Sequence, residues 1–349
     1  MSNSTRYYCT RDLVKAAIGI AGAKLNALID AKIEAASADI EILLGRKFIP
    51  LTATKLYPWP QAPETYGVLY PNEDLLAVTA LLAKAQDSSP TTIAAADYFL
   101  EPNDAGPPYS RIEIDKSSDA LFEGGDTSQR SISVAGRWGY CEDTKAAGAL
   151  AEALDASETE VQVTDSSKVG VGDTLKVESE AMFVSEKALL DTTANVTADL
   201  TESKSDVGVA VNDGTKVKQG EVITVGSERM LVESIAGTVL TVERSYDGSV
   251  LAAHSQPLDV YAPRSLTVVR GVNGTTAAAH ADATAISKYA PPGDIVELCQ
   301  AEAIAHLKQD ESGWTGQIGG MEGGVQVKMV DLYWLRERAK QKYGRAPVA

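Results

Sequence analysis

Cysteine is scarce in this sequence of 349 residues, which has only Cys9, Cys141 and Cys299, far apart along the chain. None of them belongs to a Cys-x-x-Cys pair, so their spacing excludes a zinc knuckle and a dithiol redox motif. An odd and sparse set also gives no disulfide framework. We therefore expect three reduced thiols, as in a protein that folds in the cytoplasm.

The motifs of the common enzyme classes are also missing. The chain has no Gly-x-x-x-x-Gly-Lys-Ser/Thr loop, no His-Glu-x-x-His and no Gly-x-Ser-x-Gly. It has only three histidines, which leaves few candidates for a general base. We predict that the protein is not an enzyme and has no catalytic residues, no metal and no cofactor.

No apolar run is long enough to cross a membrane. The longest extends from Leu75 to Ala83 and is interrupted by Thr79, whereas a membrane span needs about 20 residues. The segment from Met1 to Asp12 is polar, so we expect no signal peptide and no membrane partner.

Positive charge is in deficit, with 32 Lys and Arg against 48 Asp and Glu and a net charge of −16. Proteins that coat or wrap nucleic acid need a basic surface, because neutralised phosphates supply most of their affinity. The charge argues against that role. It remains compatible with a conduit through which DNA passes without being held.

Residues 1–50 show a pattern of two amphipathic helices. Thr10 is placed to cap the first helix, with Asp12 in its first turn. An apolar stripe from Leu25 to Leu44 predicts the second, and Gly45 is its stop signal. We expect an N-terminal helical hairpin.

Residues 51–141 have short alternating apolar runs, punctuated by proline and glycine, which predict a β-rich segment with long loops. The Ala-rich residues 142–155 have the composition of a linker.

Two internal repeats follow. Residues 161–186 match residues 209–234 at 11 of 26 positions, and residues 240–254 match 266–280 at 8 of 15. The halves occur in the order first, first, second, second, so the simplest account is one module nested in a loop of another. We predict an outer β-module from 156–193 and 264–290, and an inner one from 194–263. Each is expected to be a small barrel or sandwich; a strand-swapped pair is the alternative.

His254 and His280 occupy equivalent positions of the second repeat. A metal site would require the two modules to converge and to supply further ligands. We favour a turn or packing role for both histidines.

Residues 291–349 return to helical spacing. One apolar face from Ile295 to Leu307 predicts a helix, and a second helix is expected from Asp331 to Tyr343. Between them lies a segment that we predict to be a flexible loop, rich in glycine: Gly313, Trp314, Gly316, Gly319, Gly320, Gly323 and Gly324. The predicted fold class is thus α+β.

The end of the chain differs in charge from the rest. Five cations and one anion between residues 336 and 345 give it a net charge of +4. Aromatic residues and arginine are favoured at protein interfaces. We predict an interface here, with an acidic protein partner such as a neighbouring subunit or with a nucleic-acid backbone, at Tyr333, Trp334, Arg336, Arg338, Lys340, Lys342, Tyr343 and Arg345. A solvated helix end is the alternative.

The order of these parts resembles the head–tail connector proteins of tailed bacteriophages, also called adaptor or head-completion proteins. The resemblance covers residues 1–141 and 291–349. It rests on Leu43-Leu-Gly-Arg46, on Ile132-Ser-Val-Ala-Gly-Arg-Trp-Gly-Tyr140, on Pro291-Pro-Gly-Asp294 and on the terminal Lys342-Tyr-Gly-Arg345. The segment from Leu266 to His280 also resembles a β-module found in phage virion and tail-associated proteins. The inserted modules depart from a minimal connector.

The resemblance implies a helical connector core, completed by both ends of the chain, that forms a ring, commonly of twelve copies. Such a ring binds below the portal protein at the virion neck, between head and tail, after assembly in the host cytoplasm. It extends the DNA channel, with only transient, non-specific passage of DNA, and it offers a platform for the tail or a tail-completion protein.

Two other functions compete with this one. A tail-terminator or tail-completion protein is also a structural virion component. A carbohydrate-binding β-module belongs to a different class, but the repeats offer only Tyr246, Tyr261 and Tyr289 as aromatic platforms.

Overall fold

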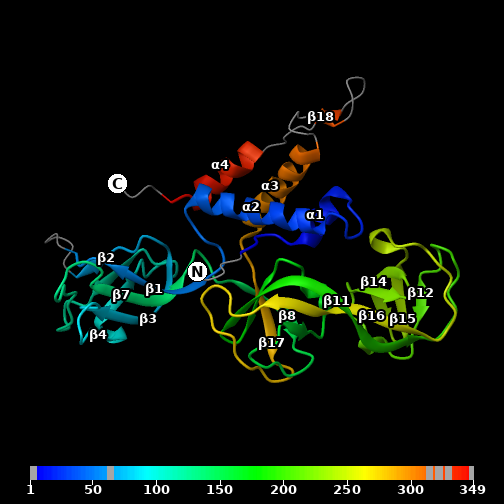
Figure 1. Ribbon diagram of the computed structural model, residues 1–349, viewed down its shortest axis with the longest axis horizontal. Coiled ribbons are helices and arrows are strands. Elements are labelled where there is room, and N and C mark those ends of the chain that lie inside the picture. The colour runs from blue at the N-terminus through cyan, green and yellow to red at the C-terminus, as the bar shows by residue number, and fades with distance from the viewer. Residues whose placement is uncertain (1–5, 61–66, 312–316, 319–324, 327–331, 346–349) are drawn as a thin grey trace.

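The computed structural model describes residues 6–60, 67–311, 317–318, 325–326 and 332–345. It combines helices with several antiparallel sheets, which confirms the α+β class. Figure 1 shows the helices lying along one side of a row of β structure.

The helices come from both ends of the chain: α1 (Arg11–Ile18), α2 (Asn26–Leu44), α3 (Gly293–Glu311) and α4 (Leu332–Tyr343). As predicted, the Thr10 side chain caps α1 by accepting a hydrogen bond from the Leu13 backbone N–H. Gly45 ends α2 in the left-handed conformation, at φ 64°, which glycine adopts without strain.

A single apolar core holds these helices together. The face of α3 predicted from Ile295 to Leu307 is buried against α2. Phe48, just beyond α2, packs edge-on against Tyr343 of α4 with their ring centroids 5.4 Å apart. The first and last parts of the chain therefore form one helical layer.

Residues 51–138 form the β-rich unit, built from two sheets around one core. One sheet has the order β1-β7-β3-β4 and the other β2-β6-β5. Trp138 is fully buried in this core, and its indole N–H donates to the Ala53 carbonyl over 2.9 Å. The strands are β1 (Leu51–Tyr57), β2 (Val68–Leu69), β3 (Leu75–Ala83), β4 (Thr91–Ile93), β5 (Tyr98–Glu101), β6 (Arg111–Ile114) and β7 (Ile132–Trp138).

The repeats lie in one long sheet with the order β12-β15-β14-β13-β16-β11-β10-β17-β8, and β9 pairs with β16. Its strands are β8 (Thr144–Ala149), β9 (Glu160–Gln162), β10 (Thr174–Val177), β11 (Glu180–Val196), β12 (Gly208–Ala210), β13 (Val222–Val225), β14 (Glu228–Ala236), β15 (Val239–Glu243), β16 (Leu258–Val269) and β17 (Ala285–Tyr289). A separate short pair joins β18 (Gln317–Ile318) to β19 (Val325–Gln326).

Two separate apolar cores lie along this sheet. One gathers buried residues from 147–184 and 266–286, and we call this part the outer module. The other gathers residues from 194–260, and we call it the inner module. The long strands β11 and β16 pair along both modules and connect them.

Residues 142–155 correct one prediction, because they are not a linker. Strand β8 pairs with β17, and Leu150 and Leu154 are buried in the core of the outer module. Alanine is the commonest residue of this segment and Thr144 is its one β-branched residue, so it has few of the residues that normally indicate a strand.

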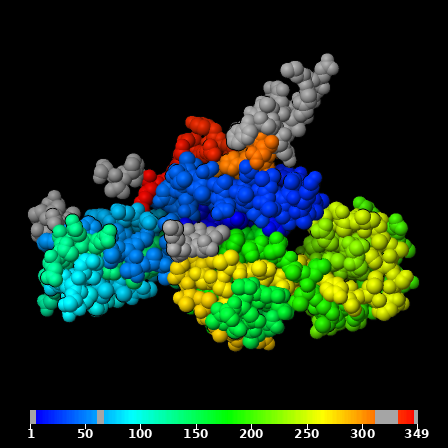
Figure 2. All heavy atoms as spheres, viewed as in Figure 1, coloured from blue at the N-terminus to red at the C-terminus, as the bar shows by residue number. Residues whose placement is uncertain are grey.

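In Figures 1 and 2 the β-rich unit, the outer module and the inner module follow one another along the longest axis. The helical layer is tied to both modules. Arg11 of α1 bonds Asp30 at 2.5 Å and Glu186 of β11 at 2.9 Å. The Gly22 N–H and Lys15 both contact Asp247 of the inner module.

Candidate functional site

The C-terminal helix carries most of the residues predicted to form an interface, and its cations are paired within the chain. Their partners are acidic residues of α3 and of α4 itself. The pairs are Arg336–Glu302 at 2.7 Å, Arg338–Glu297 at 2.5 Å, Lys340–Glu337 at 2.9 Å and Lys342–Asp294 at 2.9 Å. The positive charge of this helix is therefore largely cancelled at its own surface.

The Arg336–Glu302 pair differs from the others, because the Glu302 side chain is only 1% exposed. Burial raises the pKa of Glu302, and the Arg336 guanidinium only partly offsets that rise. Glu302 Oε2 has no hydrogen-bond partner. Arg336 thus serves the fold by neutralising a buried carboxylate.

Tyr343 and Arg345 are also occupied within the chain. Tyr343 is 3% exposed, and its hydroxyl donates to Asp294 Oδ1 over 2.7 Å. Arg345 donates to the carbonyls of Pro71 and Asn72 in the β-rich unit. The Tyr343 ring is therefore not available to a partner protein.

Tyr333 and Trp334 are different, because they are 79% and 55% exposed. The Arg338 guanidinium lies 4.6 Å from the centroid of the Trp334 ring. Of the predicted interface residues, this aromatic pair presents the largest apolar surface. The predicted flexible loop, Gly313, Trp314, Gly316, Gly319, Gly320, Gly323 and Gly324, lies outside the described residues.

Each β-module contains a buried cluster of glutamate, arginine and histidine. In the outer module, Arg270 bonds Glu180 through two nitrogens at 2.6 and 2.8 Å, and His280 Nε2 lies 2.9 Å from Glu180 Oε2. Backbone N–H groups of Gly271 and Ala278 also donate to this carboxylate.

The inner module repeats this cluster at equivalent positions. Arg244 bonds Glu228 at 2.7 and 2.8 Å, and His254 Nε2 lies 2.9 Å from Glu228 Oε2. Burial alone would raise the pKa of Glu228, but hydrogen bonds from Arg244, His254 and the backbone outweigh burial and lower the pKa to about 2. The internal repeats align Glu180 with Glu228, Arg270 with Arg244 and His280 with His254. This identity alone does not show that the three residues of each module meet.

These clusters have the geometry of structural ion pairs. The Glu180 and Glu228 side chains have no exposed surface, and donors surround both carboxylates, so neither has room to accept a substrate proton. Among the described residues, no group of His, Cys, Asp and Glu is arranged to hold a metal ion.

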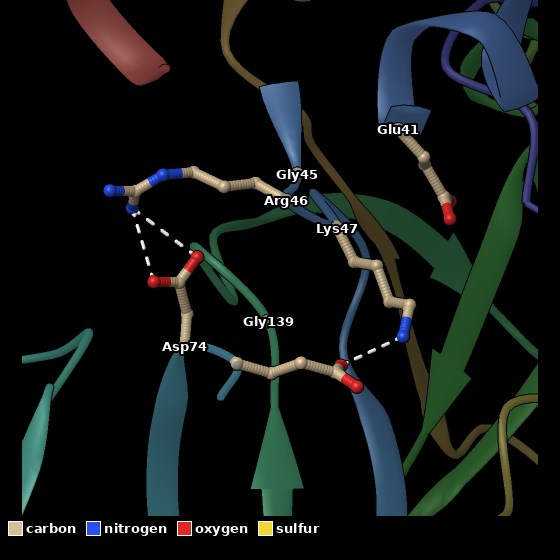
Figure 3. Close-up of a pocket in the computed structure, with 7 residues that line it drawn as sticks. Glu41, Gly45, Arg46, Lys47, Asp74 and Gly139 are labelled. Atoms are coloured by element: carbon tan, nitrogen blue, oxygen red, sulfur yellow. Dashed lines mark hydrogen bonds and ion pairs between the residues drawn. The ribbon is translucent and has the colours of Figure 1, made fainter. Parts of the chain in front are cut away.

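A small cavity of about 80 Å³ lies where the helical layer meets the β-rich unit. Figure 3 shows Arg46 reaching Asp74 across it, while Lys47 bonds Glu73 at 2.8 Å. Gly139 and Glu41 complete the lining. Since drug-sized ligands occupy pockets of roughly 300 Å³ or more, this polar junction fits a few waters and fixes the two units together.

The cysteines of the structure are free thiols, with Cys9 and Cys299 buried in the helical core. None of the helices in the described residues combines the length and apolar character that crossing a bilayer requires. Comparisons of this chain with protein-family models, curated proteins and solved structures gave no match in any of the three.

Proposed function

We propose that this chain is a structural virion protein of a tailed bacteriophage that forms a ring below the portal, extends the DNA channel and joins the capsid to the tail. One observation carries the proposal. Residues 8–49 and 295–343 share one helical core, and all of the β structure between residues 51 and 289 is inserted between them. This is the order of parts that the connector resemblance implies.

The electrostatics support a conduit for DNA. The chain has a net charge of −16, and the cations of its basic helix are paired with Asp294, Glu297, Glu302 and Glu337. A phosphate-gripping surface needs free cations. A ring of such subunits would repel DNA from its wall and let it slide.

In this proposal the helical layer makes the ring, and the exposed Tyr333 and Trp334 contact a protein partner. The inner and outer modules lie at the other side of that layer and are anchored to it through Arg11 and Asp247. They provide the outward surface for the tail or a tail-completion protein.

Binding to purified virion parts tests the proposal. We expect the chain to bind capsids that carry the portal but lack tails, and not isolated tails. Binding to isolated tails alone would favour a tail-terminator protein instead. A glycan array with the full chain addresses the carbohydrate alternative, for which we expect no reproducible binding.

A further inference from the structure

Helix α2 is apolar on two opposite sides. One side is buried in the helical core through Ile29, Ile33, Ala36, Ile40 and Leu44. The other side is exposed and carries a second stripe, with residues spaced three and four apart: Leu28, Ala31, Ala35, Ala38 and Ile42. Leu28 is 39% exposed and Ile42 is 81% exposed.

A helix with two opposite apolar sides can bury one of them in its own core and the other against a further partner. In Figure 2 part of the surface formed by α1 and α2, in blue, faces the viewer, and no other described part of the chain lies over the part that is seen. The alternating spacing of three and four is that of a seam between packed helices. Among the described residues nothing buries this face of α2, which has the pattern of an interface.

The shape of this stripe favours a bulky partner. Leu28 and Ile42 stand about 21 Å apart along the helix axis, at 1.5 Å per residue. The side chains between them, Ala31, Ala35 and Ala38, are small, so larger side chains of a partner can pack closely against the helix there.

The same chain also has large exposed side chains that can pack against these alanines. Tyr333 and Trp334 are exposed on α4, where they cannot cover the stripe of their own chain, because that stripe is exposed too. Aromatic residues of this kind commonly supply most of the binding energy at an interface.

Charge points to the same pairing. Glu34 and Asp39 are exposed on α2 beside the stripe. Arg338 and Lys340 lie on the same outer side of α4 as the aromatic pair, at helical spacing from Trp334 and Tyr333. Within one chain Arg338 and Lys340 form solvent-exposed pairs with Glu297 and Glu337. Exposed pairs of this kind contribute less than about 1 kcal/mol, so both cations can exchange these partners for Glu34 and Asp39 of a second copy.

We propose that the exposed stripe of α2 binds Tyr333 and Trp334 of α4 from a second copy of this chain. Two different surfaces then meet, which is a head-to-tail contact that closes into a ring when the rotation between copies permits. This inference rests on the ring of the proposed function and names the surfaces that build it.

Cysteine cross-linking of two full-length variants tests the pairing. One variant carries Ala35→Cys and the other Trp334→Cys, and they are mixed under mild oxidation beside the unchanged chain. We expect a disulfide-linked dimer in the mixture and none in either variant alone. A dimer of Ala35→Cys with itself would overturn the inference in favour of a symmetric α2–α2 contact.

A matched pair of charge substitutions gives an independent test. Ile42→Glu places a carboxylate in the stripe, whereas Val250→Glu makes a similar change at a residue of the inner module that is 78% exposed. We expect Ile42→Glu to weaken self-association by about tenfold or more, and Val250→Glu to leave it unchanged. Circular dichroism checks that both variants fold.

The two proposals fail in different ways. Rings that persist with Ile42→Glu and give no cross-link in the mixture would overturn the inference and leave the proposed function standing. A chain that stays monomeric at every concentration, alone and with portal present, would contradict both proposals.

Discussion

His280 Nε2 lies 2.9 Å from Glu180 Oε2, although 100 residues separate them, whereas the equivalent His254 and Glu228 are 26 residues apart and also 2.9 Å from each other. In the outer module the cluster joins residues that lie on either side of the inner module in the sequence. In the inner module the cluster joins residues within that module. The first repeat half thus combines with the last, and the two middle halves combine with each other.

The clusters should therefore be stability determinants of separate modules. Glu180→Gln leaves Arg270 buried without its counter-charge, which we expect to cost about 3–5 kcal/mol in the unfolding of the outer module. Glu228→Gln should do the same to the inner module through Arg244. Hydrogen exchange resolved by peptide would show loss of protection in the altered module first.

Glu178→Gln is the control for this test. Its carboxylate also lies 2.9 Å from His280, through Nδ1, but the Glu178 side chain is 64% exposed. Because water screens the exposed Glu178 carboxylate, we expect its pair with His280 to contribute less than about 1 kcal/mol. A loss as large as that of Glu180→Gln would contradict the role given to burial.

The inner cluster also predicts a dependence on pH. The pKa of Glu228 is about 2 in the folded chain, against 4.5 as its ordinary value. Its ionised form therefore stabilises the fold above about pH 5, and this contribution is lost as the pH falls from there toward 2. The shift corresponds to about 3 kcal/mol.

Urea unfolding of the unchanged chain and of Glu228→Gln, each at pH 7 and pH 3, measures this contribution. The difference in unfolding free energy between them should be largest at pH 7 and should shrink at pH 3. An equal difference at both values would mean that Glu228 does not titrate as described.

The terminal helix offers a test of whether its arginine serves the fold. Arg336→Ala should destabilise the helical layer by about 1–3 kcal/mol, because it leaves the Glu302 carboxylate buried without its partner. Adding Glu302→Gln should restore most of this loss, since the remaining amide is uncharged. Thermal unfolding of the single and double variants measures it, and absence of rescue would argue that Arg336 acts through other contacts.

The anchoring of the modules to the helical layer depends on Arg11, whose side chain is only 6% exposed between Asp30 and Glu186. Arg11→Ala should loosen both contacts and increase cleavage near residues 10–25 in limited proteolysis. Lys168→Ala, which removes a cation that is 51% exposed, is the control and should leave cleavage unchanged.

The helices were the most predictable part of the fold. Thr10, Asp12 and Gly45 act locally, so their capping roles can be inferred from neighbouring residues alone. The face from Ile295 to Leu307 was equally clear, because five apolar residues recur at helical spacing and all are buried. Strand β8 was missed because its alanines and glycine carry little strand preference.

The sites were harder to predict, for a physical reason. The sequence indicated a basic helix, but it did not show that Glu302 and Asp294, from a different helix, neutralise it. In the sequence, the Glu, Arg and His residues of the clusters appear only as identities between the internal repeats. Their contacts could not be predicted, because they join segments up to 100 residues apart. The sequence predicts a single apolar stripe for α2, and the second stripe, with Ile42 at 81% exposure, is recognised only from the burial of the helix.

Electron microscopy of the purified chain mixed with a candidate portal protein tests the central claim most directly, with mass photometry of each component alone. The account predicts rings stacked coaxially on the portal, with the β-modules visible as knobs on the outer rim. A chain that remains monomeric and leaves the portal unoccupied would contradict it.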